Sequence, residues 1–352
     1  MWRELKEKFR DADFSNYPFH IGLKGRPDST TNNTAAYLTY RKRWVDYPTQ
    51  KIVSEFPLCI DIEPAFACNL RCTMCYTREI DGYDNALPES RLMPFETARQ
   101  VIDEGSGYQL PSLKLTGRGE ALLNEELEKM IRHAKDKGIM DTMFNTNVTL
   151  LSEKRIEQLI QARLDLMIVS LDGLTKEVYE GIRKGASFTN VIGKIEKFVA
   201  TRDLVRRHTP RLRIQIVCMQ ENKREILQFV EQWRGVADEI NLIRFRSFTD
   251  MVRDRRKLYK GELKKVPCRQ LWQRLYVAYN GDIHMCCADY KGREVLGNIS
   301  RNTIHSIWHS KRLNQIRQYH MALEFNKIPV CMACPSNYEA DFWGWLDEEE
   351  RS

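Results

Sequence analysis

A chain of 352 residues with 42% hydrophobic and 29% charged residues has the size and composition of a globular protein with a substantial buried core. It contains no run of about 18 apolar residues and no apolar leader, so we expect a cytoplasmic protein with no membrane partner. The net charge is only +7, and we interpret the basic stretches at 202–213 and 253–265 as solvated surface or linker, so no nucleic-acid partner is expected.

The amino-terminal segment, residues 1–55, is polar and irregular. Apolar residues at helical spacing predict one short helix at Trp2–Phe9 and a second at Tyr37–Trp44. We expect the second helix to lie against the main domain.

From residue 56 to residue 250 the chain alternates between strand-like and helix-like stretches. The expected strands are Leu58–Glu63, Ser112–Thr116, Thr142–Asn145, Leu166–Ser170, Leu212–Met219 and Glu239–Arg244. The expected helices lie near 94–104, 124–137, 152–161, 188–206 and 223–235. This alternation predicts parallel strands joined by right-handed crossovers, and six units are fewer than the eight of a closed barrel. We therefore expect an α/β fold, a partial (β/α)6 TIM-like barrel.

Three cysteines follow the first expected strand with the spacing C-x3-C-x2-C: Cys68, Cys72 and Cys75. A four-iron cluster normally takes four thiolates, so three would leave one iron open to a ligand with an amino and a carboxylate group. The alternatives are a zinc knuckle, for which no fourth ligand lies nearby, or packed thiols. Ten cysteines without an export signal favour metal or cluster ligation over disulfides.

Polar residues also follow the other expected strands, at the ends where ligands gather in such barrels. Each could be a turn residue taken alone, but together they indicate a ligand site. They include Gly119, Glu120, Asn145, Asn147, Ser170 and Asn222.

A second cysteine set follows an expected linker at 251–267 and defines a small cysteine-rich domain at 268–335, with a tail at 336–352. Its members are Cys268, Cys286, Cys287, Cys331 and Cys334. The sequence Tyr279-Asn-Gly-Asp282 predicts a hairpin with a type I′ turn. From spacing alone, this set fits either an iron–sulfur cluster or a four-cysteine zinc site.

The first cysteine motif, Gly119–Glu120 and the alternating topology together resemble the radical S-adenosylmethionine (radical SAM) superfamily. The resemblance implies that Cys68, Cys72 and Cys75 hold a four-iron cluster, and that Gly119 and Glu120 receive the amino group of S-adenosylmethionine. It further implies cofactor contacts from Ser170, Arg183, Asn145, Asn147 and Asn222. Arg118 stands where the family often has the first glycine of Gly-Gly-Glu.

The carboxyl-terminal motifs resemble the SPASM extension of radical SAM enzymes. A full SPASM domain has further cysteines after its last pair, and here none follows Cys334. The resemblance therefore implies a single auxiliary four-iron cluster, closed by Cys268, Cys286, Cys331 and Cys334, that transfers electrons.

The family chemistry is reductive cleavage of S-adenosylmethionine to a 5′-deoxyadenosyl radical that removes a substrate hydrogen. A closed auxiliary cluster favours dehydrogenation of a small polar molecule such as a sugar or aminocyclitol, with a flavodoxin- or ferredoxin-like reductant. Two enzymatic alternatives stay open: epimerisation with Cys287 as the catalytic hydrogen donor, and peptide modification. The non-enzymatic alternatives are an iron–sulfur electron carrier and a zinc-binding protein.

Overall fold

The structure, a computed structural model, describes residues 20–26, 34–83, 88–205, 209–245, 264–332 and 334–337. The helix expected at Trp2–Phe9 and most of the expected linker and tail lie outside these residues. Within them, no helix is both long and apolar enough to cross a membrane.

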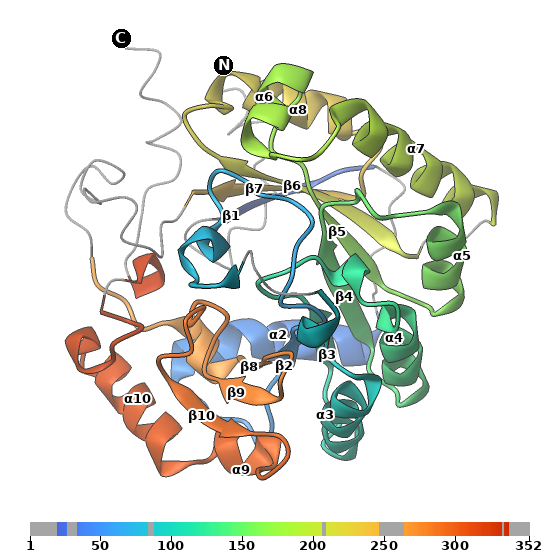
Figure 1. Cartoon of the computed structure of the whole chain (residues 1–352). Helices are drawn as coiled ribbons and strands as arrows, with labels where there is room; N and C mark the ends of the chain where they lie inside the picture. Colours follow the sequence, from blue (N-terminus) through green and yellow to red (C-terminus); the bar gives the residue numbers. More distant parts are fainter. Residues whose placement is uncertain are drawn as a thin grey trace.

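One ten-stranded sheet runs through the described residues, in the order β1-β7-β6-β5-β4-β3-β2-β8-β9-β10 (Figure 1). The strands are β1 His20–Lys24, β2 Cys59–Ile62, β3 Ser112–Leu115, β4 Asp141–Thr146, β5 Leu166–Ser170, β6 Arg211–Cys218, β7 Glu239–Arg244, β8 Arg274–Val277, β9 Asp282–His284 and β10 Val295–Asn298. Neighbours from β2 to β7 are parallel, and these are the six expected strands with bounds within one residue of the prediction. The sheet does not close on itself, which confirms the partial barrel.

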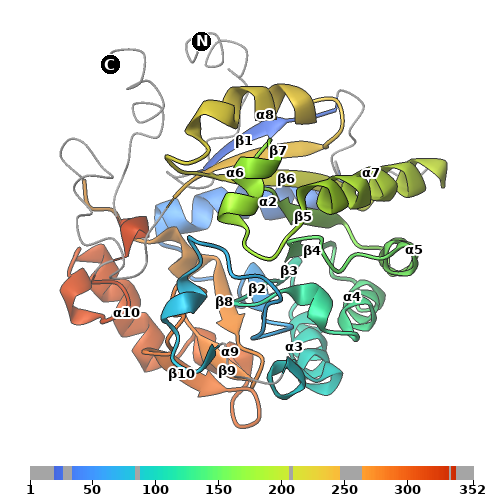
Figure 2. The ribbon, with the colours of Figure 1, turned by 45° about the horizontal axis from the view of Figure 1, so that its top comes forward.

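Most helices cover the outer face of the curved sheet, as Figures 1 and 2 show, whereas the helix α2, Ala35–Gln50, packs against residues at the start of β2. Their bounds are α2 Ala35–Gln50, α3 Phe95–Gly107, α4 Leu127–Asp136, α5 Glu153–Gln161, α6 Lys176–Ile182, α7 Phe188–Leu204, α8 Ile226–Trp233, α9 Ile304–Trp308 and α10 Lys311–Met321. Side chains alternate between the two faces of a strand, and Ile60 and Ile62 of β2 belong to the core under these helices. Asp61 and Glu63 therefore face the inside of the barrel.

Short polar side chains set the starts of several helices. Ser152, Thr175 and Ser310 accept hydrogen bonds from backbone N–H groups in the first turns of α5, α6 and α10. Such caps satisfy donors that have no partner inside the helix, which is why these helices begin where they do.

The described parts of the amino-terminal segment, residues 20–26 and 34–55, pack on the barrel. The helix expected at Tyr37–Trp44 is present as α2, and it buries Tyr40 and Trp44 against Leu58 and Cys59. Strand β1, which the sequence did not predict, pairs antiparallel with β7 and extends the sheet.

The cysteine-rich region shares the sheet with the barrel. Strand β8 pairs parallel with β2, with Asp61 opposite Tyr276. The expected hairpin joins β8 to β9, but its turn is not type I′, because only Gly281 in it has a positive φ, of 84°. The N–H of Gly281 instead bonds to the carbonyl of Ala278, which gives a three-residue loop that ends in a left-handed glycine.

Candidate active site

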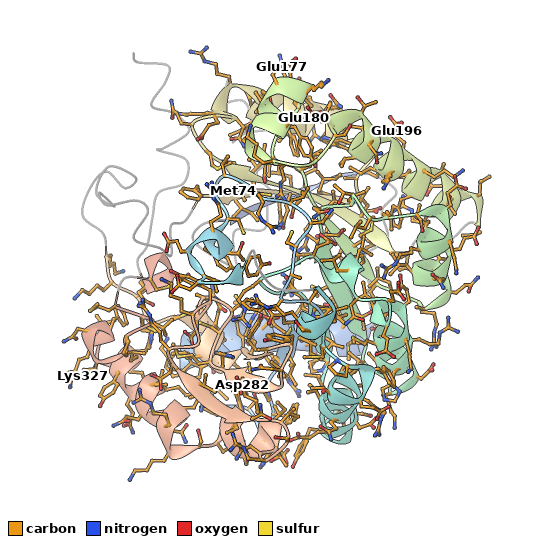
Figure 3. All side chains as sticks on the ribbon, viewed as in Figure 1. Met74, Glu177, Glu180, Glu196, Asp282 and Lys327 are labelled. Carbon is orange, nitrogen blue, oxygen red and sulfur yellow. The ribbon has the colours of Figure 1, made fainter. Side chains whose placement is uncertain are left out.

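The loop after β2 carries Cys68, Cys72 and Cys75 at the open end of the barrel; Figure 3 labels Met74 within it. The backbone N–H of Arg71 donates to the carbonyl of Lys184 at 2.9 Å. The N–H of Thr73 donates to the carbonyl of Ile182, also at 2.9 Å. The segment after α6 therefore holds the loop in place from a position more than a hundred residues along the chain.

None of the ten cysteines forms a disulfide. Burial raises the pKa of Cys68 to about 12 and also raises the pKa of Cys72, although the charge of Arg183 lowers the latter in part. Thiols with raised pKa values bind a metal as thiolates, so binding releases their protons to solvent. Within the described residues, no group of three or more Cys, His, Asp or Glu side chains is close enough together to bind a single metal ion. In a four-iron cluster each thiolate binds a different iron, so the thiols need only surround the cluster.

Gly119 and Glu120 lie directly beside this loop. A Cβ at Gly119 would come within 2.3 Å of the carbonyl oxygens of Ala65 and Ala67, so only glycine fits. The N–H of Glu120 donates to the carbonyl of Ala67 at 2.8 Å. The motif is thus fixed against the residues that lead into Cys68.

The carboxylate of Glu120 is buried and already has protein partners. Its Oε1 accepts from the N–H of Leu122 at 3.1 Å and the hydroxyl of Thr146 at 2.7 Å. Its Oε2 accepts from the N–H of Asn147 at 2.7 Å. Burial raises the pKa of Glu120 against the effect of these donors. A carboxylate oxygen accepts two hydrogen bonds, so Oε2 keeps a position for a further donor.

Asn147 contacts the cysteine loop itself. Its Nδ2 donates to Oδ1 of Asn69 at 3.0 Å and lies 3.9 Å from Sγ of Cys68. Asn145 lies two residues earlier on β4, and its buried Oδ1 has no partner within the described residues. Ser170, at the end of β5, accepts from Nε2 of Gln215 at 3.2 Å.

Arg183 is not a surface charge of α6, since only 9% of it is exposed. Its Nε donates to Oδ2 of Asp172 at 2.7 Å, and Asp172 is fully buried. Its charge also lowers the pKa values of Cys72 and of Glu120, so the guanidinium acts on both the cysteine loop and the glycine-glutamate motif.

Asn222 differs from the expectation of a cofactor contact. Its side chain is fully buried, and its Oδ1 accepts from the N–H of Met219 at 2.8 Å. Its Nδ2 donates to the carbonyls of Val217 at 2.8 Å and Asp172 at 3.1 Å. With both amide hydrogens used, Asn222 shapes the loop after β6 and has no donor left for a ligand.

Arg118 stands where the family often has the first glycine of Gly-Gly-Glu, and it forms a buried ion pair. Its Nε and Nη2 donate to Oε1 and Oε2 of Glu63 at 2.8 and 2.6 Å, and Glu63 is fully buried. Its Nη1 donates to the carbonyl of Tyr290 at 3.1 Å, and the guanidinium lies 4.1 Å from the ring centroid of Phe66. Arg118 therefore ties the end of β2 to the cysteine-rich region. The sequence feature that pointed to this ion pair was Glu63, a glutamate directly after an apolar strand.

In the carboxyl-terminal region one pocket is lined by four thiols, those of Cys268, Cys286, Cys331 and Cys334. Burial and the neighbouring thiols raise the pKa values of Cys286 and Cys331. The buried Oδ1 of Asn337, which also lines the pocket, has no partner within the described residues. Four convergent thiols fit a four-iron cluster with one thiolate per iron.

Cys287 lies outside that pocket, although Cys286 is in it. The thiol of Cys287 acts electrostatically on Tyr76, directly after Cys75, and on Lys114 of β3. Lys114 is paired with Asp61 across β2 and β3, and so faces the barrel interior. Of the two adjacent cysteines, only Cys286 lines the pocket.

Family comparisons agree with this geometry. The sequence model of the radical SAM superfamily matches residues 62–232, and that of the SPASM iron–sulfur cluster-binding domain matches residues 268–335. The chain belongs to the radical SAM superfamily. As a radical SAM enzyme it uses S-adenosylmethionine and a four-iron cluster, and its SPASM domain binds an auxiliary iron–sulfur cluster.

Curated relatives include the GTP 3′,8-cyclase of Limosilactobacillus fermentum, 25% identical over 236 residues, which are 66% of this chain and 63% of that protein. A tungsten-containing aldehyde ferredoxin oxidoreductase cofactor-modifying protein of Pyrococcus furiosus is 23% identical over 80% of this chain and 88% of its own. The chain spans between 42% and 63% of the length of the first four cyclases it matches.

Solved structures share the fold of this radical SAM protein at low identity. The structure of anSMEcpe with bound AdoMet has a TM-score of 0.60 at 17% identity, over 83% of this chain and 96% of that one. The complex of BtrN with AdoMet and 2-DOIA has a TM-score of 0.54 at 14% identity, over 81% and 94%. Streptococcus suis SuiB bound to S-adenosylmethionine has a TM-score of 0.57 at 16% identity, over 87% and 77%.

Proposed function

We propose that this radical SAM enzyme dehydrogenates a small polar substrate, such as a sugar or aminocyclitol, and that Cys268, Cys286, Cys331 and Cys334 hold the electron-accepting auxiliary cluster. The single observation that carries the proposal is the convergence of these four thiols on one pocket. Four thiolates leave no iron free to bind a substrate, so this centre serves electron transfer.

Cys68, Cys72 and Cys75 would hold the first cluster, and Glu120 and Arg183 would bind the amino and carboxylate groups of S-adenosylmethionine. Oε2 of Glu120 offers an acceptor to an ammonium group, and Nη1 of Arg183 offers a donor to a carboxylate. The clusters and S-adenosylmethionine, when bound, supply a radical that removes a hydrogen atom and an acceptor for the second electron. The protein supplies position and polarity around the reacting carbon.

The barrel interior supports a polar substrate. Asp61, Lys114 and Asn145 face it from β2, β3 and β4, and Tyr276 faces it from β8. Tyr276 is only 3% exposed, and its hydroxyl interacts with the buried carboxylate of Glu63. Oδ1 of Asn145 is buried without a hydrogen-bond partner in the described part of the chain. An unpaired buried polar atom is costly, and a hydroxyl group of a substrate would satisfy it. We also infer a flavodoxin- or ferredoxin-like reductant, which the basic balance of the chain would attract.

The test is anaerobic reconstitution with iron and sulfide, followed by incubation with S-adenosylmethionine, a reductant and a panel of sugars and aminocyclitols. We expect 5′-deoxyadenosine together with a product lighter by two hydrogens, and neither from the triple variant Cys68→Ala/Cys72→Ala/Cys75→Ala. Fully loaded enzyme that never forms 5′-deoxyadenosine would leave only the electron-carrier alternative.

The second candidate, epimerisation, rests on Cys287, which does not line the four-thiol pocket and whose charge would act on Tyr76 and Lys114. The thiol of Cys287 would return a hydrogen atom to the opposite face of a substrate radical, and the thiyl radical left behind would regain an electron from the reductant and a proton from solvent. In deuterated water the epimer would then carry one deuterium, because thiols exchange with solvent. Cys287→Ala would still form 5′-deoxyadenosine but no epimer. If dehydrogenation is the reaction, Cys287→Ala keeps the oxidised product.

A further inference from the structure

Two buried basic side chains lie one turn apart on α10, beside the four-thiol pocket. His320 is fully buried and lines the pocket, and Arg317 is only 2% exposed. Residues three apart on a helix share a face, so both are held against the same side of the cysteine-rich region. In Figure 1, α10 packs outside β8, β9 and β10.

The hydrogen bonds of His320 fix its tautomer. Its Nδ1 lies 3.1 Å from the backbone N–H of Cys268, and an N–H group can only donate, so Nδ1 is the acceptor. The ring hydrogen is therefore on Nε2, which lies 3.3 Å from Sγ of Cys331. The ring of Phe325, with its centroid 4.8 Å away, packs against the imidazole. One side chain thus contacts two of the four cysteines and donates a hydrogen bond to the sulfur of one.

Arg317 is a buried cation, and the groups that accept its hydrogen bonds are neutral. Its Nε donates to the carbonyl of Leu271 at 3.0 Å, and its Nη1 donates to the carbonyl of Trp308 at 2.9 Å and Oδ1 of Asn314 at 2.7 Å. Its buried Nη2 has no hydrogen-bond partner among the described residues, and no carboxylate there forms an ion pair with it. The guanidinium carbon lies 4.3 Å from the ring centroid of Trp308, which is also uncharged. A buried charge without a counter-ion is strongly destabilising. Leu271 lines the pocket, so an anionic cluster there would stand near this cation.

We propose that His320 and Arg317 are positioning residues that raise the reduction potential of the auxiliary cluster. The inference rests on the proposed assignment of Cys268, Cys286, Cys331 and Cys334 as its ligands. Reduction adds one negative charge to the cluster, and an N–H donor to a ligand sulfur and a nearby buried cation both stabilise that charge. The higher potential suits a centre that takes an electron from a substrate radical.

The experiment measures the potential of the auxiliary cluster in the full-length chain, in the Cys68→Ala/Cys72→Ala/Cys75→Ala background that removes the other cluster. EPR-monitored redox titrations compare His320→Phe with His320→Gln, which restores a donor, and Arg317→Met with Arg317→Lys, which restores the charge. We expect His320→Phe and Arg317→Met each to lower the reduction potential of the cluster. At a fixed applied potential the ratio of oxidised to reduced cluster should rise about tenfold, which corresponds to about 59 mV for one electron. The His320→Phe spectrum should also change, and the restoring variants should stay near the parent.

Iron content is measured before each titration. An unchanged potential in fully loaded His320→Phe overturns the role of His320, and the same result in Arg317→Met overturns that of Arg317. If His320→Phe loses its iron, the potentials of Arg317→Met and Arg317→Lys still test whether a side chain of α10 raises the potential of the cluster. The iron content of His320→Gln then tests whether a hydrogen-bond donor at position 320 is needed to retain the cluster. A background protein with no cluster at all refutes the ligand assignment, and with it the proposed function.

Discussion

The carboxylate of Glu120 serves both the protein and the expected ligand. Three donors, from Leu122, Thr146 and Asn147, hold it in place, and one acceptor position on Oε2 stays available. Because the same contacts fix the loop after β4, the residue that would bind the ammonium group also shapes the rim around it. Affinity for S-adenosylmethionine should therefore depend on the charge of this one side chain.

We predict that Glu120→Gln weakens binding of S-adenosylmethionine by about 1.5–3 kcal/mol. The change removes a charge-assisted hydrogen bond, and the amide N–H groups of the glutamine cannot accept one from the ammonium group. Anaerobic equilibrium dialysis of iron-loaded protein measures the affinity. Glu157→Gln, on the exposed face of α5, is the matched control and should bind normally. Equal affinities for the two variants would show that Glu120 does not contact the cofactor.

Asp141 begins β4, is only 3% exposed, and should make the stability of the protein depend on pH. Burial, with a smaller effect of Asp165, raises its pKa to about 6, although Arg211 and Arg41 lower it. A pKa raised above the unfolded value of about 3.9 favours folding below pH 4, and this contribution is lost as the pH rises through 6.

Asp141→Asn should therefore stabilise the fold by about 1–3 kcal/mol at pH 8, and the gain should shrink as the pH falls toward 4. Urea unfolding followed by tryptophan fluorescence at several pH values measures the difference. Glu157→Gln again provides an exposed control. A gain that grows as the pH falls would contradict the assignment.

At the scale of elements, the Arg118–Glu63 pair joins the ends of β2 and β3 and, through Tyr290, the cysteine-rich region. Arg118→Met should destabilise the protein by about 3–5 kcal/mol, since it leaves a buried carboxylate unpaired. Arg99→Met, which breaks the exposed pairs with Glu96 and Asp103, should cost less than about 1 kcal/mol. The double variant Glu63→Gln/Arg118→Met should recover part of the loss in urea unfolding, and no recovery would argue against the pair.

The six parallel strands were predictable because their apolar residues alternate with turn signals and long amphipathic helices. Strand β5 and strand β7 match the expected bounds residue for residue. Strand β1 was missed because an edge strand of His20–Lys24 has no distinct pattern, and α6 because it has only seven residues.

The rim of the barrel was predictable because the ends of parallel strands meet there. The partners of its residues were not. Arg183 pairs with Asp172 and Arg118 with Glu63, and such pairs depend on three-dimensional neighbours that local pattern does not encode. The same limit explains why Asn222 was expected to contact the cofactor although it is enclosed by backbone groups.

For the whole molecule, the two cysteine sets predict a simple iron count. Anaerobically reconstituted protein should contain about eight irons, and Cys68→Ala/Cys72→Ala/Cys75→Ala about half as many. Iron and zinc are measured together by plasma emission spectrometry. Four irons and one zinc in the wild type would identify the carboxyl-terminal site as a zinc site.

The pairing of β8 with β2 joins the segments that lead to the two cysteine sets. Strand β2 leads into the loop of Cys68, and β8 leads through a three-residue loop to β9 and Cys286. Backbone hydrogen bonds between these strands fix the separation of the two cysteine sets, and the Arg118–Tyr290 contact adds a second link. Electron tunnelling slows steeply with distance, so clusters held in segments that two paired strands anchor would keep a steady separation and a steady rate of electron exchange.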